Sequence, residues 1–269
     1  MSEPNYKSHN NIASSRNFNV NFNYAWNNKE NYWSPMGISQ ADILLNNAKS
    51  SIHKFGSCSI SNQVSQSSPI TIWDGGDLYN FPSNQGESLV INSDDPSDDQ
   101  AIVVMGLDEN FLEKTETVIL DGVTEVPLSG KWSRVFRAYN DGSSDLTGEI
   151  YIGQGGGGDS FAEIHDGNNQ TLMGVYTVPD NYTGYLLKFH CSAQNSSSAQ
   201  INFVTQIRTR DYGKVFRTRR IISFSTINSD EESLLFPIEL PPKSDIMFNI
   251  VDSDGNNGSV NVDFDIALH

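Results

Sequence analysis

Cysteine is scarce in this sequence, and its scarcity excludes a disulfide scaffold. Only two cysteines, Cys58 and Cys191, occur in 269 residues, whereas small disulfide-stabilised domains carry many cysteines in a short chain. The two could pair with each other, but the interpretation that we favour is a pair of buried free thiols.

Long apolar runs are missing as well. The first residues, MSEPNYKSHNN, do not contain the apolar segment of a signal peptide. No stretch reaches the roughly 18–20 apolar residues that a membrane-spanning helix needs. The sequence therefore predicts a chain that is made in a cytoplasm and has no membrane partner.

Basic side chains are few, and their distribution is uneven. The chain has 17 Lys and Arg against 33 Asp and Glu, for a formal net charge of −16. Residues 69–187 hold four basic and twenty acidic side chains, so the acidity belongs to the middle of the sequence. Such a surface repels nucleic acid and anionic membranes, and we expect neither as a partner.

Patterns of catalytic and metal-binding residues are also lacking. None of the five histidines stands at metal-ligand spacing from another histidine or a cysteine, and no hydrolase nucleophile motif occurs. The glycine run GQGGGGDS has no lysine where a phosphate-binding loop needs one. The segment DSDGNNGSVNVD lacks the glycine and the glutamate of a calcium loop.

Two weaker alternatives stay open at this point. Acids are plentiful, so a carboxylate pair for glycoside hydrolysis is not excluded, although nothing singles out a pair. The acidic loop NSDDPSDDQ could hold a cation weakly, although a solvated loop is the expected state. The sequence predicts no catalytic residue, no cofactor and no metal, and hence a protein that is not an enzyme.

The polar composition favours strands and turns over helices. Asn, Ser, Thr and Gly favour turns, and segments of about six residues alternate apolar and polar side chains. We predict an all-β chain with two jelly-roll-like β-sandwich lobes on either side of the glycine run, at residues 51–154 and 155–269. The alternation is clearest from Val260 to Leu268. The stretch QTLMGVYTVPDNYTGYLLKF predicts a hairpin in the second lobe.

Residues 1–50 differ from the rest and predict an extended N-terminal arm. The segment is rich in Asn, which gives it little tendency to fold alone. Its aromatic residues are candidates for an interface, because exposed apolar surface usually finds a partner. The alternative is a disordered tail. The six candidate residues are Phe18, Phe22, Tyr24, Trp26, Tyr32 and Trp33.

One segment, RTRDYGKVFRTRR, departs from the acidity of the chain. Its turn, Asp211-Tyr212-Gly213, predicts a hairpin in which Arg208 and Arg210 share one strand face, as do Arg217 and Arg219. Either the cations offset acids of their own lobe, or they form a docking face for an acidic partner, which could be another copy of the chain. The candidate residues are Arg208, Arg210, Lys214, Arg217, Arg219 and Arg220.

Eight segments, in order, resemble a large family of virion structural proteins from tailed phages of marine bacteria. Together they span roughly residues 52–269, and the arm has no counterpart in the resemblance. The segments are IHKFG (52–56), ITIWDGG (70–76), VMGLDENF (104–111), ETVILDGVTEV (116–126), SRVFRAYN (133–140), GEIYIG (148–153), GNNQTLMGVYTVPDNYTGYL (167–186) and IRTRDYGKVFRTR (207–219).

The resemblance implies a particle component without catalytic residues. The role that it favours is a head decoration or cement protein, bound to the outside of the major capsid shell in the virion. The implied partners are the major capsid protein and further copies of the chain, for which we expect a closed trimer. The alternative is a neck or tail component, such as an adaptor, a fibre or a carbohydrate-binding receptor module.

Deletion of residues 1–50 tests whether the arm attaches the protein to its particle. Each of the six aromatic side chains can bury about 150–250 Å², which is more apolar contact than a flat sandwich face offers. We predict a folded, soluble body that no longer binds particles, checked by circular dichroism and by co-sedimentation with particles. Normal occupancy by the truncated protein contradicts the prediction.

Overall fold

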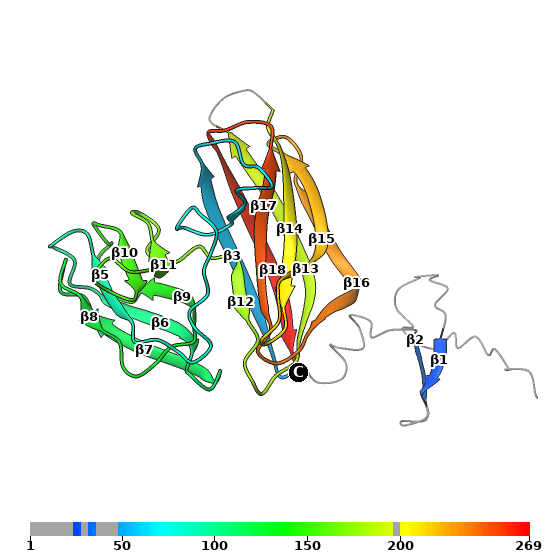
Figure 1. The fold of residues 1–269 in the computed structure, drawn as a ribbon, viewed down its shortest axis with the longest axis horizontal. Coiled ribbons are helices and arrows are strands. Elements are labelled where there is room, and N and C mark those ends of the chain that lie inside the picture. The colour runs from blue at the N-terminus through cyan, green and yellow to red at the C-terminus, as the bar shows by residue number, and fades with distance from the viewer. Residues whose placement is uncertain (1–23, 28–31, 36–47, 196–199) are drawn as a thin grey trace, which may run out of the picture. The chain divides into compact units, whose positions relative to one another are not determined.

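The computed structural model describes residues 24–27, 32–35, 48–195 and 200–269. All regular secondary structure in these residues is β-strand, which confirms the prediction of an all-β chain (Figure 1). Within the same residues, no helix has the length and apolar character needed to cross a membrane. The chain forms two compact units, residues 1–38 and 39–269.

The described residues of the first unit form an antiparallel strand pair. Strands β1 (Tyr24–Asn27) and β2 (Tyr32–Pro35) pair with Trp26 opposite Trp33. Part of the predicted extended arm is therefore a two-stranded ribbon, which holds four of the six candidate aromatic residues. The other two, Phe18 and Phe22, lie outside the described residues.

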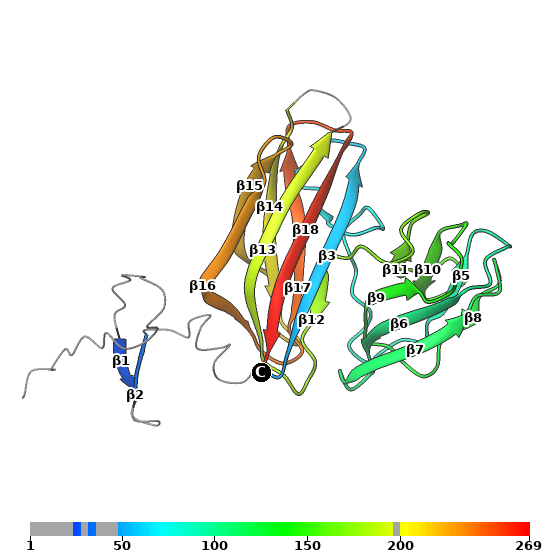
Figure 2. The ribbon, with the colours of Figure 1, turned by 180° about the vertical axis from the view of Figure 1, so that it is seen from behind.

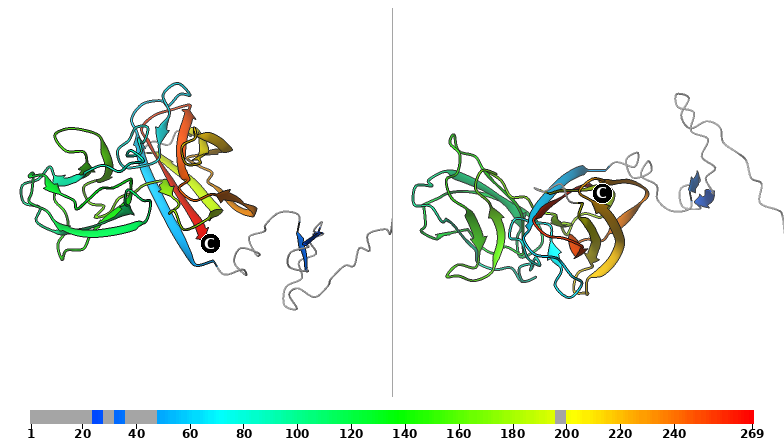
Figure 3. Two further views of the ribbon diagram at one scale, coloured as in Figure 1. Left: turned by 60° about the horizontal axis from the view of Figure 1, so that its bottom comes forward. Right: turned by 90° about the horizontal axis from the view of Figure 1, so that it is seen from above.

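Nine strands of the second unit form the large sandwich. One sheet has the order β16-β13-β18-β3 (Figure 2), and the other has the order β12-β17-β14-β15 with the short strand β4 beside β17. Numbered one to eight along the chain, β3 and β12 to β18 give sheets 1-8-3-6 and 2-7-4-5, the strand order of a jelly roll. Two further views in Figure 3 show the sheets facing each other.

The bounds of these strands follow the alternation of the sequence. In β18 the side chains of Val260, Val262, Phe264 and Ile266 are buried, and Asp263 and Asp265 between them are half-buried on the other face, as predicted. The strands are β3 Ser50–Ile60, β4 Ile70–Thr71, β12 Val175–Thr177, β13 Gly184–Asn195, β14 Asn202–Arg210, β15 Arg217–Ser225, β16 Asp230–Leu240, β17 Asp245–Ser253 and β18 Gly258–Leu268.

The remaining strands of this unit form a second, smaller sandwich, which we call the inserted lobe. Its sheets have the orders β11-β10-β5-β8 and β7-β6-β9, and they enclose a core of their own that includes Trp132, Val104 and Ile152. The strands are β5 Val90–Ser93, β6 Ala101–Leu107, β7 Glu113–Ile119, β8 Val126–Pro127, β9 Arg134–Asn140, β10 Ile150–Gly153 and β11 Ser160–Ile164.

The predicted lobe boundary at the glycine run is wrong. Strands β10 and β11 pair across the run, with Gly153 opposite Ser160, so the run is a hairpin loop inside one lobe. The large sandwich starts earlier, because β3 pairs with β18 along its whole length. In the chain, the inserted lobe thus lies between the short strand β4 and strand β12 of the large sandwich. Trp73 and Met173, one at each end of this insertion, form a β-bridge with each other.

Two local predictions also need correction. Strands β12 and β13 do not form the predicted hairpin: β12 pairs with β17, while β13 pairs with β16 and β18 in the other sheet. The arm boundary at residue 50 is too late, because Ser50 already pairs with Leu268 and the amide of Lys49 donates to the Leu268 carbonyl at 2.8 Å. The arm deletion should therefore end at residue 47.

The two cysteines are free and buried, as predicted. They lie on β3 and β13, the two neighbours of β18. Burial raises the pKa of both thiols to about 12, so neither is a reactive thiolate at neutral pH.

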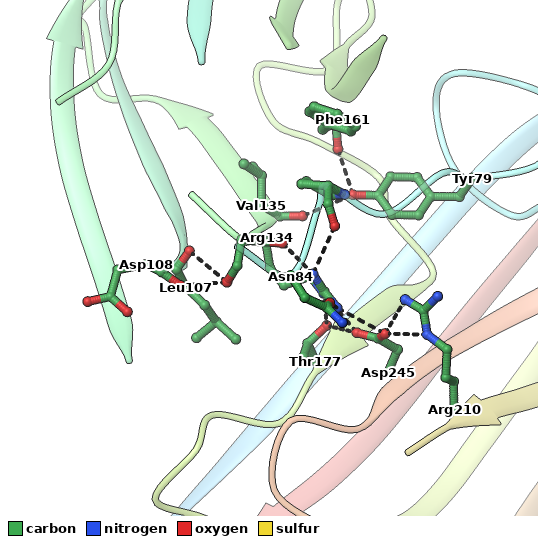
Figure 4. A network of polar contacts seen from close by, with 12 residues as sticks. Tyr79, Asn84, Leu107, Asp108, Arg134, Val135, Phe161, Thr177, Arg210 and Asp245 are labelled. Carbon is green, nitrogen blue, oxygen red and sulfur yellow. Dashed lines mark hydrogen bonds and ion pairs between the residues drawn. The ribbon is translucent and has the colours of Figure 1, made fainter. Parts of the chain in front are cut away.

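A buried ion pair joins the inserted lobe to the large sandwich (Figure 4). Arg134 on β9 donates to both oxygens of Asp245 on β17, at 2.8 and 3.1 Å, and both side chains are only 2% exposed. Thr177 on β12 donates to the same carboxylate at 2.6 Å, and Arg210 on β14 donates at 2.8 Å. Asn84 accepts from Arg134 at 2.9 Å. The carboxylate is therefore saturated with donors, as a buried charge requires.

Aromatic rings surround this ion pair. The guanidinium of Arg134 lies 4.9 Å from the ring centroid of Phe111 and 5.2 Å from that of Phe81. The guanidinium of Arg210 lies 4.5 Å from the ring centroid of Phe216. Each ring presents its electron-rich face to a cation, and together the rings keep water away from the pair.

A bulge in β9 makes a second contact between the two sandwiches. Val135 pairs with Gly106 and Arg137 pairs with Met105, so Phe136 is an extra residue in the ladder. Its ring lies 5.0 Å from that of Tyr176 in the large sandwich, and its carbonyl accepts a hydrogen bond from Nζ of Lys54 on β3. Burial, with a smaller effect from Arg137, lowers the pKa of Lys54 to about 7.

Replacement of Asp245 by Asn tests the ion pair. The amide keeps the shape of the carboxylate but leaves the buried guanidinium of Arg134 without an anion, which typically costs about 3–5 kcal/mol. We expect a loss of this size in the free energy of unfolding, measured by urea denaturation with tryptophan fluorescence.

The matched control is Asp180→Asn. Asp180 pairs with Lys243 at 3.1 Å but is 46% exposed, and exposed pairs contribute only about 0–1 kcal/mol. Equal effects of the two substitutions contradict the role given to Asp245.

Lys54 predicts a pH dependence of stability. Its pKa falls from 10.5 to about 7 on folding, so the unfolded chain binds more protons between these values, and stability must rise with pH across that window. Since each pKa unit corresponds to about 1.4 kcal/mol, the change is about 5 kcal/mol over the whole window, of which about 4 kcal/mol falls between pH 6 and 10. Lys54→Met should remove this rise, measured as the free energy of unfolding from pH 6 to 10. The exposed Lys131→Met is the control, and a rise that persists in Lys54→Met refutes the assignment.

Candidate docking surface

The basic segment forms the predicted hairpin. Strands β14 and β15 pair antiparallel, and Thr209 lies opposite Arg217 at the end next to the turn. The amide of Lys214 donates to the carbonyl of Asp211 at 2.9 Å, and Gly213 adopts a φ of 68°, which only glycine takes without strain. The turn predicted from Asp211, Tyr212 and Gly213 is therefore confirmed.

Two of the six basic residues belong to the junction between the sandwiches. Arg208 and Arg210 share a strand face, as predicted, and Phe216 covers both, with its ring centroid 5.7 and 4.5 Å from the two guanidinium carbons. Arg210 also binds Asp245. Arg210 therefore offsets a charge of its own chain, which is the first of the two interpretations of the segment.

The other four basic residues are more exposed. Arg217 pairs with Asp211 at 2.6 Å and is 55% exposed, and Arg220 pairs with Glu232 on β16. Ile207 pairs with Arg220 and Arg208 pairs with Thr218, so Arg219 is a bulge residue and the predicted shared face of Arg217 and Arg219 is interrupted there. The docking role of these residues stays a prediction.

The turn of the hairpin also exposes apolar side chains, which the sequence analysis did not single out. Val215 is 76% exposed and Tyr212 is 49% exposed. A hollow of about 430 Å³ beside them is lined by Asp211, Gly213, Lys214, Val215 and Arg217. The sequence signal that could have indicated this surface is Val215, an apolar residue in a polar turn. We call residues 211–219 the hairpin tip.

Contacts with two other turns hold the hairpin tip in place. The ring of Tyr212 packs edge-on against Phe111, with centroids 5.4 Å apart, and Nζ of Lys243 lies 5.4 Å from the Tyr212 ring centroid. Phe111 has a φ of 63° and Lys243 a φ of 62°, conformations that cost energy in residues other than glycine. The carbonyl of Phe111 accepts from the amide of Asp180 at 2.9 Å. The tip is thus supported by the inserted lobe and by the large sandwich.

A cluster of titratable residues elsewhere offers no comparable site. His165 lies 3.7 Å from Glu163 and 4.0 Å from Glu149. Nearby, Asp74 accepts from the amide of Leu172 at 2.7 Å, and burial raises the pKa of Asp74 to about 7. In the part of the chain that the structure describes, no group of three or more His, Cys, Asp or Glu is arranged to hold a metal ion.

In the acidic loop at residues 94–99, the side chain of Asp98 stabilises the structure. Asp98 is fully buried and accepts from the Ser93 hydroxyl at 2.6 Å and from the amides of Thr147 and Gly148 at 2.8 and 3.0 Å. These bonds lower the pKa of Asp98 against the opposing effect of burial, which is the largest single influence. Asp98 therefore ties two loops together, whereas Asp94 and Asp99 beside it are exposed.

Comparisons with known proteins yield distant structural similarities, among them two to structures from infectious bursal disease virus. No protein-family model matches the sequence, and no curated protein matches it. A structure of the infectious bursal disease virus Gt strain has 9% identity and a TM-score of 0.20, covering 82% of this chain and 75% of that chain. A mutant VP2 protein of infectious bursal disease virus, in derived T=1 particles, has 11% identity and a TM-score of 0.17, covering 81% and 72%. TM-scores of this size assign neither a fold nor a function.

Proposed function

We propose that the chain is a non-enzymatic structural component of a virus particle, in which it decorates the outside of the major capsid shell. The jelly roll is compatible with this role, because viral capsid proteins use it, but lectins and cupins use it too. The fold alone therefore does not decide the function.

The observation that carries the proposal is the position of the segments that resemble virion proteins. Lys54, Phe111, Arg134, Thr177 and Arg210 fall in five of the eight segments. The first four contact the other sandwich directly, and Arg210 binds the Asp245 carboxylate at the junction. The resemblance thus concerns residues that build a two-lobed body. Residues that fix the two lobes relative to each other suit a protein that binds at a fixed position in an assembly.

The copy number of the protein in purified virions tests the proposal. A decoration protein covers many equivalent positions of the shell, so its band in a denaturing gel should have a molar intensity of the same order as that of the major capsid protein. A few copies per particle contradict decoration and favour a neck or tail component. Absence from purified virions contradicts a particle role altogether.

A further inference from the structure

The hairpin tip combines exposed apolar and basic side chains on one surface. Val215 is the most exposed of the large apolar side chains in the described part of the chain. Lys214 next to it and Arg219 further along β15 are exposed, and neither side chain forms a hydrogen bond or ion pair with another described residue. An exposed apolar centre with unpaired charges around it is the usual make-up of a protein–protein contact.

A surface of matching character but opposite charge lies on the inserted lobe. Ile119 and Val123, 59% and 55% exposed, flank the exposed Asp121. The turn that contains them is held against the acidic loop by two backbone hydrogen bonds of 2.9 Å, from Gly122 to Asp98 and from Ser93 to Gly122. We call this surface the acidic end; its members are Asp94, Asp99, Ile119, Asp121 and Val123.

The two surfaces cannot meet within one chain. The hairpin tip contacts Phe111, next to the start of β7, whereas Ile119 is the last residue of the same strand. A strand of seven residues separates the two places by about 23 Å. The partner that supplies the acidic end must therefore be another molecule.

We propose that the hairpin tip of one copy docks on the acidic end of a second copy. Lys214, Arg217 and Arg219 then face Asp94, Asp99 and Asp121, and the apolar side chains Val215 and Val123 meet at the centre of the contact. The contact is head-to-tail, because it joins different surfaces of the two copies, and such contacts close into rings or continue as chains. It involves this chain alone, so it holds or fails independently of the virion role.

Charge reversal on each surface tests the contact in the purified full-length protein. The variants are Lys214→Asp with Arg219→Asp on the hairpin tip, and Asp99→Lys with Asp121→Lys on the acidic end. None of these four side chains makes an intramolecular hydrogen bond or ion pair with a described residue, so both variants should melt like the unmodified protein. Lys131→Asp, an exposed charge outside both surfaces, is the control.

Sedimentation velocity at micromolar concentration should show self-association of the unmodified protein that weakens between about 0.05 and 0.5 M salt. Each double variant should weaken it about a hundredfold or more, because like charges then face each other. Mixing the two variants should restore association, since the reversed tip fits the reversed end. Each substitution changes the charge by two, so the net charge of −16 becomes −20 and −12. Both variants remain negative, and overall attraction cannot explain the recovery.

Three results overturn the proposal: a monomer at all concentrations, undiminished association of either double variant, or a mixture that does not recover. If a charge variant melts at a lower temperature than the unmodified protein, the single variants Val215→Ser and Val123→Ser are tested in place of the two double variants. Each should weaken association at least about tenfold, which corresponds to about 1.4 kcal/mol, and association unchanged in both also overturns the proposal.

Discussion

The buried pair of Arg134 and Asp245 is the interaction on which the arrangement of the second unit depends. Burying two charges is unfavourable unless their attraction and their hydrogen bonds compensate the lost hydration. Here the carboxylate receives donors from β9, β12 and β14, and aromatic rings cover both guanidinium groups. A pair with so many partners fits only one relative position of the inserted lobe and the large sandwich, so it selects that position even where its net contribution to stability is small.

The hairpin tip depends on the same junction. Arg210 ends β14 and binds Asp245, and Phe216 precedes β15 and stacks on Arg210. Both strands of the hairpin are therefore fixed at the point where the tip begins. Tyr212 then packs on Phe111 of the inserted lobe. Because the basic surface is anchored at its base and at its turn, little backbone entropy remains to be lost when a partner binds.

The sequence predicts strands and some turns well but strand pairing poorly, and even the local hairpin expected from β12 and β13 does not form. The alternation in β18, the all-β class and the hairpin of β14 and β15 depend on residues close together in the chain, and all three are confirmed. The glycine run at residues 153–161 fits a linker and a hairpin loop equally, and only the pairing of β10 with β11 decides between them. Likewise, nothing in the sequence around Arg134 indicates a buried ion pair, because its partner Asp245 is distant in the chain. In the basic segment, the turn and its cations could be predicted from the sequence. The binding of Arg210 to Asp245 at the junction could not.

Net charge and local charge play different parts in an association of such acidic molecules. Two copies with a net charge of −16 repel each other at a distance. At physiological ionic strength the Debye length is about 8 Å, so acids away from a contact are largely screened. Charges inside the contact lose part of their hydration and are screened much less. A few cations at the hairpin tip can therefore outweigh a large excess of acids elsewhere, provided that apolar side chains such as Val215 exclude water from the contact.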